Sequence, residues 1–352
     1  MHLFTPLRLR ELELRNRIAV SPMCQYSAEN GHPTTWHLVH LGSRAVGGAA
    51  LVMAEATGVQ AIGRISPTDT GIYLDSHADA WKPIAEFIRA QGAIAGIQLA
   101  HAGRKGSTAA PWLGGKMVPL ETGGWTPVAP SAVRFADDYP MPKELTKSEI
   151  EQIISDFQMA ARRALRAGFQ IVEIHAAHGY LLHEFYSPLS NLRTDEFGGS
   201  FDNRIRLLLK VVDAVRSVWP QQQPVFVRIS STDWAEGGWD LPQSVELSRR
   251  LKNAGVDLVD CSSGGNIATA KIPVGPGYQV EFAAAIRREA KIATGAVGMI
   301  TDPAQAETII RSGQADIVLL ARELLRDPYW PRHAAQSFGA KIKPPVQYER
   351  AW

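Results

Sequence analysis

Cysteine is scarce in this sequence, which has only Cys24 and Cys261 among its 352 residues. Two thiols cannot by themselves supply the ligands of an iron–sulfur cluster or of a structural zinc site. Low cysteine usage also favours a reducing compartment over an oxidising one. We therefore expect no metal centre and a cytoplasmic location.

An excess of one charge and long apolar runs are also missing. The 37 basic and 35 acidic residues give a net charge of +2, and the basic residues are scattered, unlike those of a nucleic-acid-binding protein. No apolar run approaches the roughly 18 residues of a membrane-spanning helix. Charges interrupt the first 20 residues, which excludes the pattern of a signal peptide. We expect neither a nucleic-acid partner nor a membrane partner.

Short apolar runs recur along the chain, and most of them follow a glycine suited to end a helix. Eight runs read as strands: IAVSPM from Ile18, LVMAEA from Leu51, AIAGIQLA from Ala93, FQIVEIH from Phe169, PVFVRIS from Pro224, VDLVDC from Val256, IATGAVG from Ile292 and QADIVLLA from Gln314. Continuous apolar strands alternating with helices indicate a parallel sheet buried on both faces. The repeat therefore predicts an α/β fold, a (β/α)8 TIM barrel formed by residues 1–352 as a single domain.

Helix signals separate these strands. Thr146 and Glu149 form a capping box ahead of apolar residues at helical spacing, and Asp302 followed by Pro303 marks another helix start. A further helix is expected from about Thr35, and it contains the pair His37 and His40. We interpret that pair as structural, because residues three apart on a helix merely share one face.

Residues 103–145, after the third strand, interrupt the alternation of predicted strands and helices. They contain six prolines and show neither helical nor strand periodicity. A connection of this length inside a compact domain is usually functional, so we predict a lid over the site. A disordered insertion is the alternative, and Trp112, Trp125 and Phe135 argue against it because disordered segments contain few aromatic residues.

Catalytic groups of such a barrel are expected where strands end, and the densest group there is HAAHGY, from His175 to Tyr180. Three interpretations are open. The two histidines could bind a metal, but a catalytic zinc usually has a third protein ligand. They could be satisfied by nearby backbone. They could also hold a substrate oxyanion, with Tyr180 as the proton donor.

Other strand ends carry further candidates. Cys24 follows the first strand and could face a ligand or act as a nucleophile, whereas Cys261 is expected in the core. The loops after strands seven and eight are where barrels bind phosphate, which implies a phosphorylated cofactor or substrate. No G-x-G-x-x-G follows a strand, so a dinucleotide bound in Rossmann fashion is not supported.

The ordered set of motifs resembles the old yellow enzyme flavoproteins, and within them the bacterial NADPH dehydrogenase and xenobiotic reductase subgroup called thermophilic-like. The resemblance rests on SPMCQYSAENG, IQLAHAGRK, HAAHGYLLHEFYSPLSNLRTDEFGGSFDNR, GMITDP, RELLRDP and the terminal PPVQYERAW, and it covers almost the whole chain. It implies an FMN across the barrel mouth. The residues implied to bind this cofactor are Pro22, Met23, Cys24, Ala56, Gln98, His175, Arg228, Gly298, Ala321 and Arg322.

The resemblance also implies roles for individual side chains. His175 and His178 match the two oxyanion donors, and Tyr180 matches the proton donor. Cys24 and Tyr26 match residues of the substrate pocket. Many family members have glycine where Ala321 stands, which leaves the shape of the phosphate site open at that point.

In the same subgroup a C-terminal segment reaches into the site of a neighbouring subunit. Residues 344–352 match this segment, with Arg350 and Trp352 as the residues that enter the partner's pocket. The resemblance therefore implies a homodimer or a homotetramer.

The implied activity is that of an ene-reductase. NADPH, or NADH, reduces the flavin, and the C=C bond of an α,β-unsaturated carbonyl compound is then reduced in the same pocket; nitro compounds and quinones are further candidate substrates. One rival interpretation is a flavin-free barrel lyase or isomerase acting on a phosphorylated substrate, with Glu55 or Glu173 as its base. The other is a non-catalytic flavin-binding protein.

Overall fold

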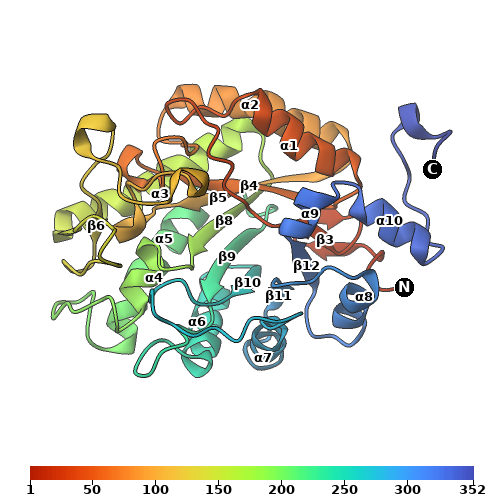
Figure 1. Cartoon of the computed structure of the whole chain (residues 1–352). Coiled ribbons are helices and arrows are strands. Elements are labelled where there is room, and N and C mark those ends of the chain that lie inside the picture. The colour runs from red at the N-terminus through yellow and green to blue at the C-terminus, as the bar shows by residue number, and fades with distance from the viewer.

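The computed structural model describes residues 1–352, the whole chain. Eight parallel strands form its centre: β3 (Ile18–Val20), β4 (Leu51–Gly58), β5 (Ile94–Ala100), β8 (Ile171–Ala176), β9 (Val225–Ser230), β10 (Leu258–Ser262), β11 (Ala293–Ala296) and β12 (Ile317–Leu320). They close a barrel in chain order, with β12 paired to β3 (Figure 1). The eight predicted strands and the predicted TIM barrel are confirmed.

Helices cover the outside of the barrel (Figure 1). They are α1 (Thr35–Val46), α2 (Asp75–Ala90), α3 (Lys147–Ala167), α4 (Leu181–Tyr186), α5 (Phe201–Arg216), α6 (Leu241–Asn253), α7 (Val280–Ala290), α8 (Pro303–Arg311), α9 (Arg322–Arg326) and α10 (Trp330–Ser337). The predicted capping box starts α3: Thr146 and Glu149 each accept the other's backbone N–H, at 2.8 and 3.3 Å. Asp302 caps α8 in the same way, by accepting two N–H groups of its first turn.

Apolar side chains fill the lower part of the barrel. Leu51, Ile171 and Phe226 belong to one buried cluster with Leu9 and Leu14 of an N-terminal hairpin, formed by β1 (Leu7–Leu9) and β2 (Leu12–Leu14). The hairpin therefore closes the bottom of the barrel. Burying one such side chain contributes about 1.5–3 kcal/mol, so this end is built for stability.

The upper part of the barrel interior is polar. Gln98 pairs with Glu173 in register, and Arg228 pairs with both His175 and Asp260. Register partners point to the same side of a sheet, so these side chains share the interior above the apolar layers. Function is therefore expected at this end, where the carboxyl ends of the strands lie.

The segment 103–145 follows β5, as predicted. It contains short 3-10 turns and two two-residue strands, β6 (Val128–Ala129) and β7 (Lys143–Glu144), which pair in parallel. In Figure 1 it lies beside the barrel near α3 and α4, on the side opposite the C-terminus. Its role as a lid stays a prediction.

The C-terminal residues leave the barrel beside α10 (Figure 1). They contain one 3-10 turn, η5 (Val346–Tyr348). None of the helices is both long enough and apolar enough to cross a membrane.

Candidate active site at the barrel mouth

Three rings meet where β8 ends. The ring centroid of His175 lies 5.1 Å from that of His178 and 5.1 Å from that of Tyr180, and both pairs are nearly perpendicular, at 83° and 78°. His175 and Tyr180 come from opposite ends of one short turn. The predicted cluster at 175–180 is therefore present as a compact group.

Backbone geometry brings these rings together. His178 and Gly179 have φ angles of +60° and +73°, in the left-handed region, and α4 begins directly after Tyr180. A non-glycine residue in that region costs about 1–2 kcal/mol, a cost typical of functional sites. At Gly179 a Cβ atom would lie 2.2 Å from the carbonyl oxygen of Gly265, so only glycine fits there.

The two imidazoles are neutral. Burial, and secondarily the positive charge of Arg228, lower the pKa of both His175 and His178 well below the ordinary value. Nε2 of His178 lies 2.7 Å from the Ser262 hydroxyl, while Nδ1 of His175 is buried without a hydrogen-bond partner. An unpartnered buried nitrogen is costly, and a bound ligand oxygen would satisfy it.

The phenol of Tyr180 is protonated at any ordinary pH. Burial raises its pKa well above 10. The Lys105 ammonium lies 5.3 Å from the centre of its ring and donates to the carbonyl oxygens of His178 and Gly265. A protonated phenol suits the role of an acid and not that of a base.

Cys24 and Tyr26 lie in the loop after β3. Burial, with the nearby carboxyl groups of Asp69 and Glu55, raises the pKa of the Cys24 thiol well above its usual value, so the group is no activated nucleophile. Tyr26 has a φ of +51°, and its ring packs edge-on against Trp112 of the insertion, with centroids 5.5 Å apart. Cys261 is fully buried, as expected of a core residue.

Glu55, a candidate base of the rival lyase or isomerase, does not face the mouth. The pairing of β4 with β5 shifts at this residue, so that Ala56 and not Glu55 stands opposite Gln98. This β-bulge turns the carboxylate away from the barrel interior. Glu55 instead accepts the Gln25 N–H at 3.0 Å and lies 3.6 Å from Nε2 of His37.

Gln98 and Arg228 form the floor of the mouth. Gln98 donates to Glu173 at 2.8 Å, and Arg228 donates to the Ser21 hydroxyl at 3.1 Å, directly before Pro22 and Met23. Nε of Arg228 lies 3.3 Å from an Asp260 oxygen. Burial and the negative charge of Asp260 raise the pKa of Glu173, and this carboxyl group is fully buried against Gln98, where a substrate does not reach it.

One cavity of about 240 Å³ joins the three residues expected around the phosphate with Arg228, which is expected on the pyrimidine side of the flavin. Arg228, Gly298, Ala321 and Arg322 all line it. Gly298 has a φ of +120°, and a Cβ atom there would lie 2.7 Å from Nε2 of Gln279. The missing side chain keeps this wall open, and the Arg322 guanidinium group suits a phosphate. The cavity therefore fits the phosphorylated end of FMN.

Arg350 and Trp352 lie away from this chain's own mouth. The Trp352 indole stacks on Tyr329, with centroids 6.4 Å apart, and lies 5.4 Å from the ring of His333 on α10. Both C-terminal residues are exposed. Within one chain they do not line the site, so a contribution to a partner's pocket stays a prediction.

Sequence reasoning missed several residues around the mouth. Lys105, His183 and Asp233 all contact the 175–180 turn or its supports, whereas Ser262, which lies 2.7 Å from His178, was already a candidate as a polar residue at the end of the sixth strand. Lys105 and His183 stand inside the motifs IQLAHAGRK and HAAHGYLLHEFYSPLSN, which was the available signal. Asp233 lies in a loop with no recognisable pattern, and only the fold brings it near.

A barrel whose mouth joins neutral imidazoles, a protonated phenol and an arginine-lined cavity defines an enzyme that binds a phosphorylated cofactor. Over residues 2–340 the chain matches the NADH:flavin oxidoreductase / NADH oxidase family. The protein belongs to this family, and the expected old yellow enzyme relationship is confirmed. It is therefore an FMN-dependent oxidoreductase that takes electrons from a nicotinamide nucleotide.

Individual relatives agree with this assignment. The chain is 51% identical to an NADPH dehydrogenase of Geobacillus sp. (strain WCH70), with 99% of this chain and 98% of the relative covered. It is 46% identical to an NADPH dehydrogenase of Bacillus subtilis (strain 168), with 99% of each covered.

Two solved structures share the fold. Morphinone reductase matches with a TM-score of 0.82 at 28% identity, over 98% of this chain and 92% of that one. An old yellow enzyme homologue from Zymomonas mobilis matches with a TM-score of 0.81 at 29% identity, over 98% and 94%.

Proposed function

We propose that the protein is an NADPH-dependent ene-reductase that saturates the C=C bond of α,β-unsaturated carbonyl compounds. The observation that carries the proposal is the cluster of His175, His178 and Tyr180, three rings with centroids about 5 Å apart beside the arginine-lined cavity. The names of the curated relatives support NADPH as the hydride donor.

The chain's own residues bind and polarise the substrate. Bound FMN supplies the hydride that NADPH provides. His175 and His178 hold the carbonyl oxygen and stabilise the negative charge that develops on it, an effect worth about 3 kcal/mol per donor in other enzymes. Tyr180, which its raised pKa keeps protonated, delivers a proton to Cα. The same donors would bind the oxygens of nitro compounds and quinones.

The residues proposed to hold FMN surround the mouth. Backbone of Pro22, Met23 and Ala56 borders the reactive edge, Gln98 and Arg228 bind the pyrimidine side, and Gly298, Ala321 and Arg322 bind the phosphate. Cys24 and Tyr26 form part of the substrate pocket. The β-bulge at Glu55 supports this arrangement, because it gives the small Ala56 the interior position.

We also infer that the insertion acts as a lid and that residues 344–352 enter a neighbouring subunit. Trp112 of the insertion contacts Tyr26, which supports the first inference. The second is supported by the exposed Trp352, of which 42% is accessible. Removing residues 344–352 should then weaken the homodimer or homotetramer, as light scattering would show. An unchanged mass together with unchanged substrate affinity would contradict this inference.

The experiment for the proposed activity is an anaerobic spectral titration. The visible spectrum of the purified protein should show bound flavin, NADPH should bleach it, and cyclohexenone should restore the colour. A protein that bleaches but never recovers with any enone would contradict the ene-reductase proposal and leave the family assignment intact. A flavin that NADPH does not bleach would favour the non-catalytic alternative.

A further inference from the structure

The turn that carries His178 and Tyr180 is bound on all sides by hydrogen bonds. The His178 N–H donates to the Ser230 hydroxyl at 2.9 Å, and that hydroxyl donates to the Gly264 carbonyl at 2.8 Å. The Lys105 ammonium donates to the His178 carbonyl. The remaining donor at the centre of the turn is the N–H of Gly179. Its partner is a fully buried side chain outside the 175–180 turn.

That partner is His183, on α4. The Gly179 N–H donates to Nδ1 of His183 at 2.9 Å, and Nε2 of the same ring lies 2.8 Å from an Asp233 oxygen. Nδ1 can accept only if it carries no proton, so the proton of the neutral ring is on Nε2 and points at Asp233. The carboxylate therefore selects the tautomer that binds the turn.

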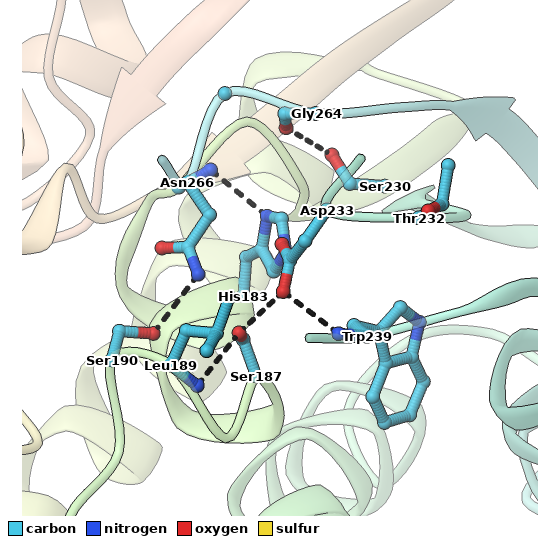
Figure 2. A network of polar contacts seen from close by, with 12 residues as sticks. His183, Ser187, Leu189, Ser190, Ser230, Thr232, Asp233, Trp239, Gly264 and Asn266 are labelled. Carbon is cyan, nitrogen blue, oxygen red and sulfur yellow. Dashed lines mark hydrogen bonds and ion pairs between the residues drawn. The ribbon is translucent and has the colours of Figure 1, made fainter. Parts of the chain in front are cut away.

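Asp233 is itself fixed in place (Figure 2). Its second oxygen accepts the Ser187 hydroxyl at 2.5 Å and the Trp239 N–H at 2.9 Å. The Tyr186 ring stacks on His183 at 4.6 Å and an interplanar angle of 25°.

Packing alone does not explain this pair. The side chains of His183 and Asp233 are both fully buried, and replacing a buried polar pair by apolar groups of the same volume is often neutral for stability or favourable. What apolar groups cannot supply is a directed acceptor for the Gly179 N–H. The left-handed geometry of His178 and Gly179 needs that acceptor, because a buried N–H without a partner is costly.

We propose that His183 and Asp233 are positioning residues, which fix the turn at Gly179 and thereby aim His178 and Tyr180 into the mouth. This inference rests on the proposed function of those two residues. His183 acts through its acceptor nitrogen, and Asp233 acts by holding the ring in the tautomer that leaves this nitrogen free.

Two substitutions at one position separate the two contacts of the ring. In His183→Asn, the amide oxygen takes the place of Nδ1 and still accepts the Gly179 N–H, while the contact with Asp233 is lost. In His183→Gln, the amide nitrogen still reaches Asp233, while the acceptor for Gly179 is lost. If the role of His183 is merely structural, ligand affinity and hydrogen–deuterium exchange should follow the melting temperature in both variants. If His183 positions the turn, these two quantities should differ between the variants independently of the melting temperature.

The first readout is the affinity for 4-hydroxybenzaldehyde, measured on the flavin-loaded protein by its change in absorbance. We expect His183→Gln to weaken binding about tenfold or more, because small displacements of a positioned group cost this much. The affinity of His183→Asn should stay within about threefold of that of the wild type. Its melting temperature should nevertheless fall more than that of His183→Gln, because Asp233 loses its contact with the ring.

The second readout is hydrogen–deuterium exchange of the peptide over residues 176–186, which requires neither ligand nor turnover. Faster exchange is expected in His183→Gln and near wild-type exchange in His183→Asn. His77→Gln is the matched control: His77 is a buried histidine on α2 that accepts the Leu74 N–H at 3.4 Å and lies 3.1 Å from the Asn30 carbonyl, away from the turn. This control should lower the melting temperature and leave both readouts unchanged.

The outcomes distinguish this inference from the proposed function. Ligand affinity and exchange that follow the melting temperature across all three variants would overturn the positioning role. If the wild type does not bind the phenol or reduce enones, the proposed function fails, and the exchange pattern alone then decides whether His183 fixes the turn. Asp233→Asn, which keeps the shape of the side chain, should slow enone reduction more than flavin reduction by NADPH; equal slowing of both would also count against positioning.

Discussion

The chain contains the spacing His-x-x-His twice, and the two pairs have different roles. His37 and His40 lie on one face of α1, while His175 and His178 span the end of β8 and a left-handed turn. His37, His40 and His175 are almost completely buried, while His178 is partly exposed. The difference shows that the element carrying the pair, and not the spacing, determines whether it can meet a ligand.

Hydrogen bonding explains the difference further. Nδ1 of His37 accepts the Thr34 N–H at 2.9 Å, so this ring helps to cap its own helix. Nδ1 of His175 has no partner in the protein. Burial lowers the pKa of both His40 and His175, so charge does not separate the pairs. Nε2 of His37 also has no hydrogen-bond partner, but it faces the buried Glu55 carboxyl group at 3.6 Å, whereas the free nitrogen of His175 stands at a strand end, where a substrate can reach it.

The test of this comparison with the largest expected effect removes the proton donor beside His175 and His178. In Tyr180→Phe, enone reduction should slow by about 10²- to 10⁴-fold, the usual contribution of a general acid, because the phenol proton is lost. Flavin reduction by NADPH should survive, since it needs no proton from Tyr180. Stopped-flow measurement of the two half-reactions checks this, and equal slowing of both would show that the ring is only structural.

Removing one histidine from each pair gives the direct contrast. His175→Ala should weaken binding of a phenolic ligand and slow enone reduction by about 10²- to 10³-fold, the usual cost of one oxyanion donor. His40→Gln is the counterpart on α1 and should bind the phenol as the wild type does. The measurement is the same spectral titration on both variants. Equal phenol affinity in the two would contradict the division between the pairs.

The fold was largely predictable because its signals are local. Most of the strands are continuous apolar runs after a glycine such as Gly168 or Gly255, and the capping box at Thr146 needs only neighbouring residues. The cluster from His175 to Tyr180 was visible for the same reason. All of its members lie within one short turn, so sequence proximity already implied spatial proximity.

The parts that were missed depend on register or on distant contacts. The bulge that turns Glu55 outward is one extra residue in β4, and no residue pattern distinguishes it from a regular strand. Asp233 and His183 are 50 positions apart and meet only because β8 and β9 are neighbours in the barrel. Side-chain roles that arise from tertiary pairing cannot be assigned from one sequence.

A smaller effect concerns the pH dependence of stability that His40 contributes. Burial, and secondarily the charge of Arg44, lower the pKa of His40 to about 3, against about 6.5 in an unfolded chain. Between these values the unfolded state binds the additional proton, so the protein loses stability as the pH falls from about 6.5 towards 3. His40→Gln removes this term, and its unfolding free energy should fall less between pH 7 and pH 5, by about 2 kcal/mol. Denaturant titrations at the two pH values measure it, and parallel losses in both proteins would refute it.

The smallest expected effect concerns the capping member of the helix pair. In His37→Asn, the amide oxygen can still accept the Thr34 N–H, but the contact of Nε2 with Glu55 at 3.6 Å is lost. We expect a loss of at most about 1 kcal/mol in the free energy of unfolding, because at 3.6 Å this contact is longer than a hydrogen bond and should contribute less than one. Because Glu55 holds the Gln25 N–H next to Cys24, phenol affinity reports whether the loss spreads to the mouth. A change below about threefold would keep the α1 pair structural, whereas a change as large as that of His175→Ala would join the two pairs into one functional unit.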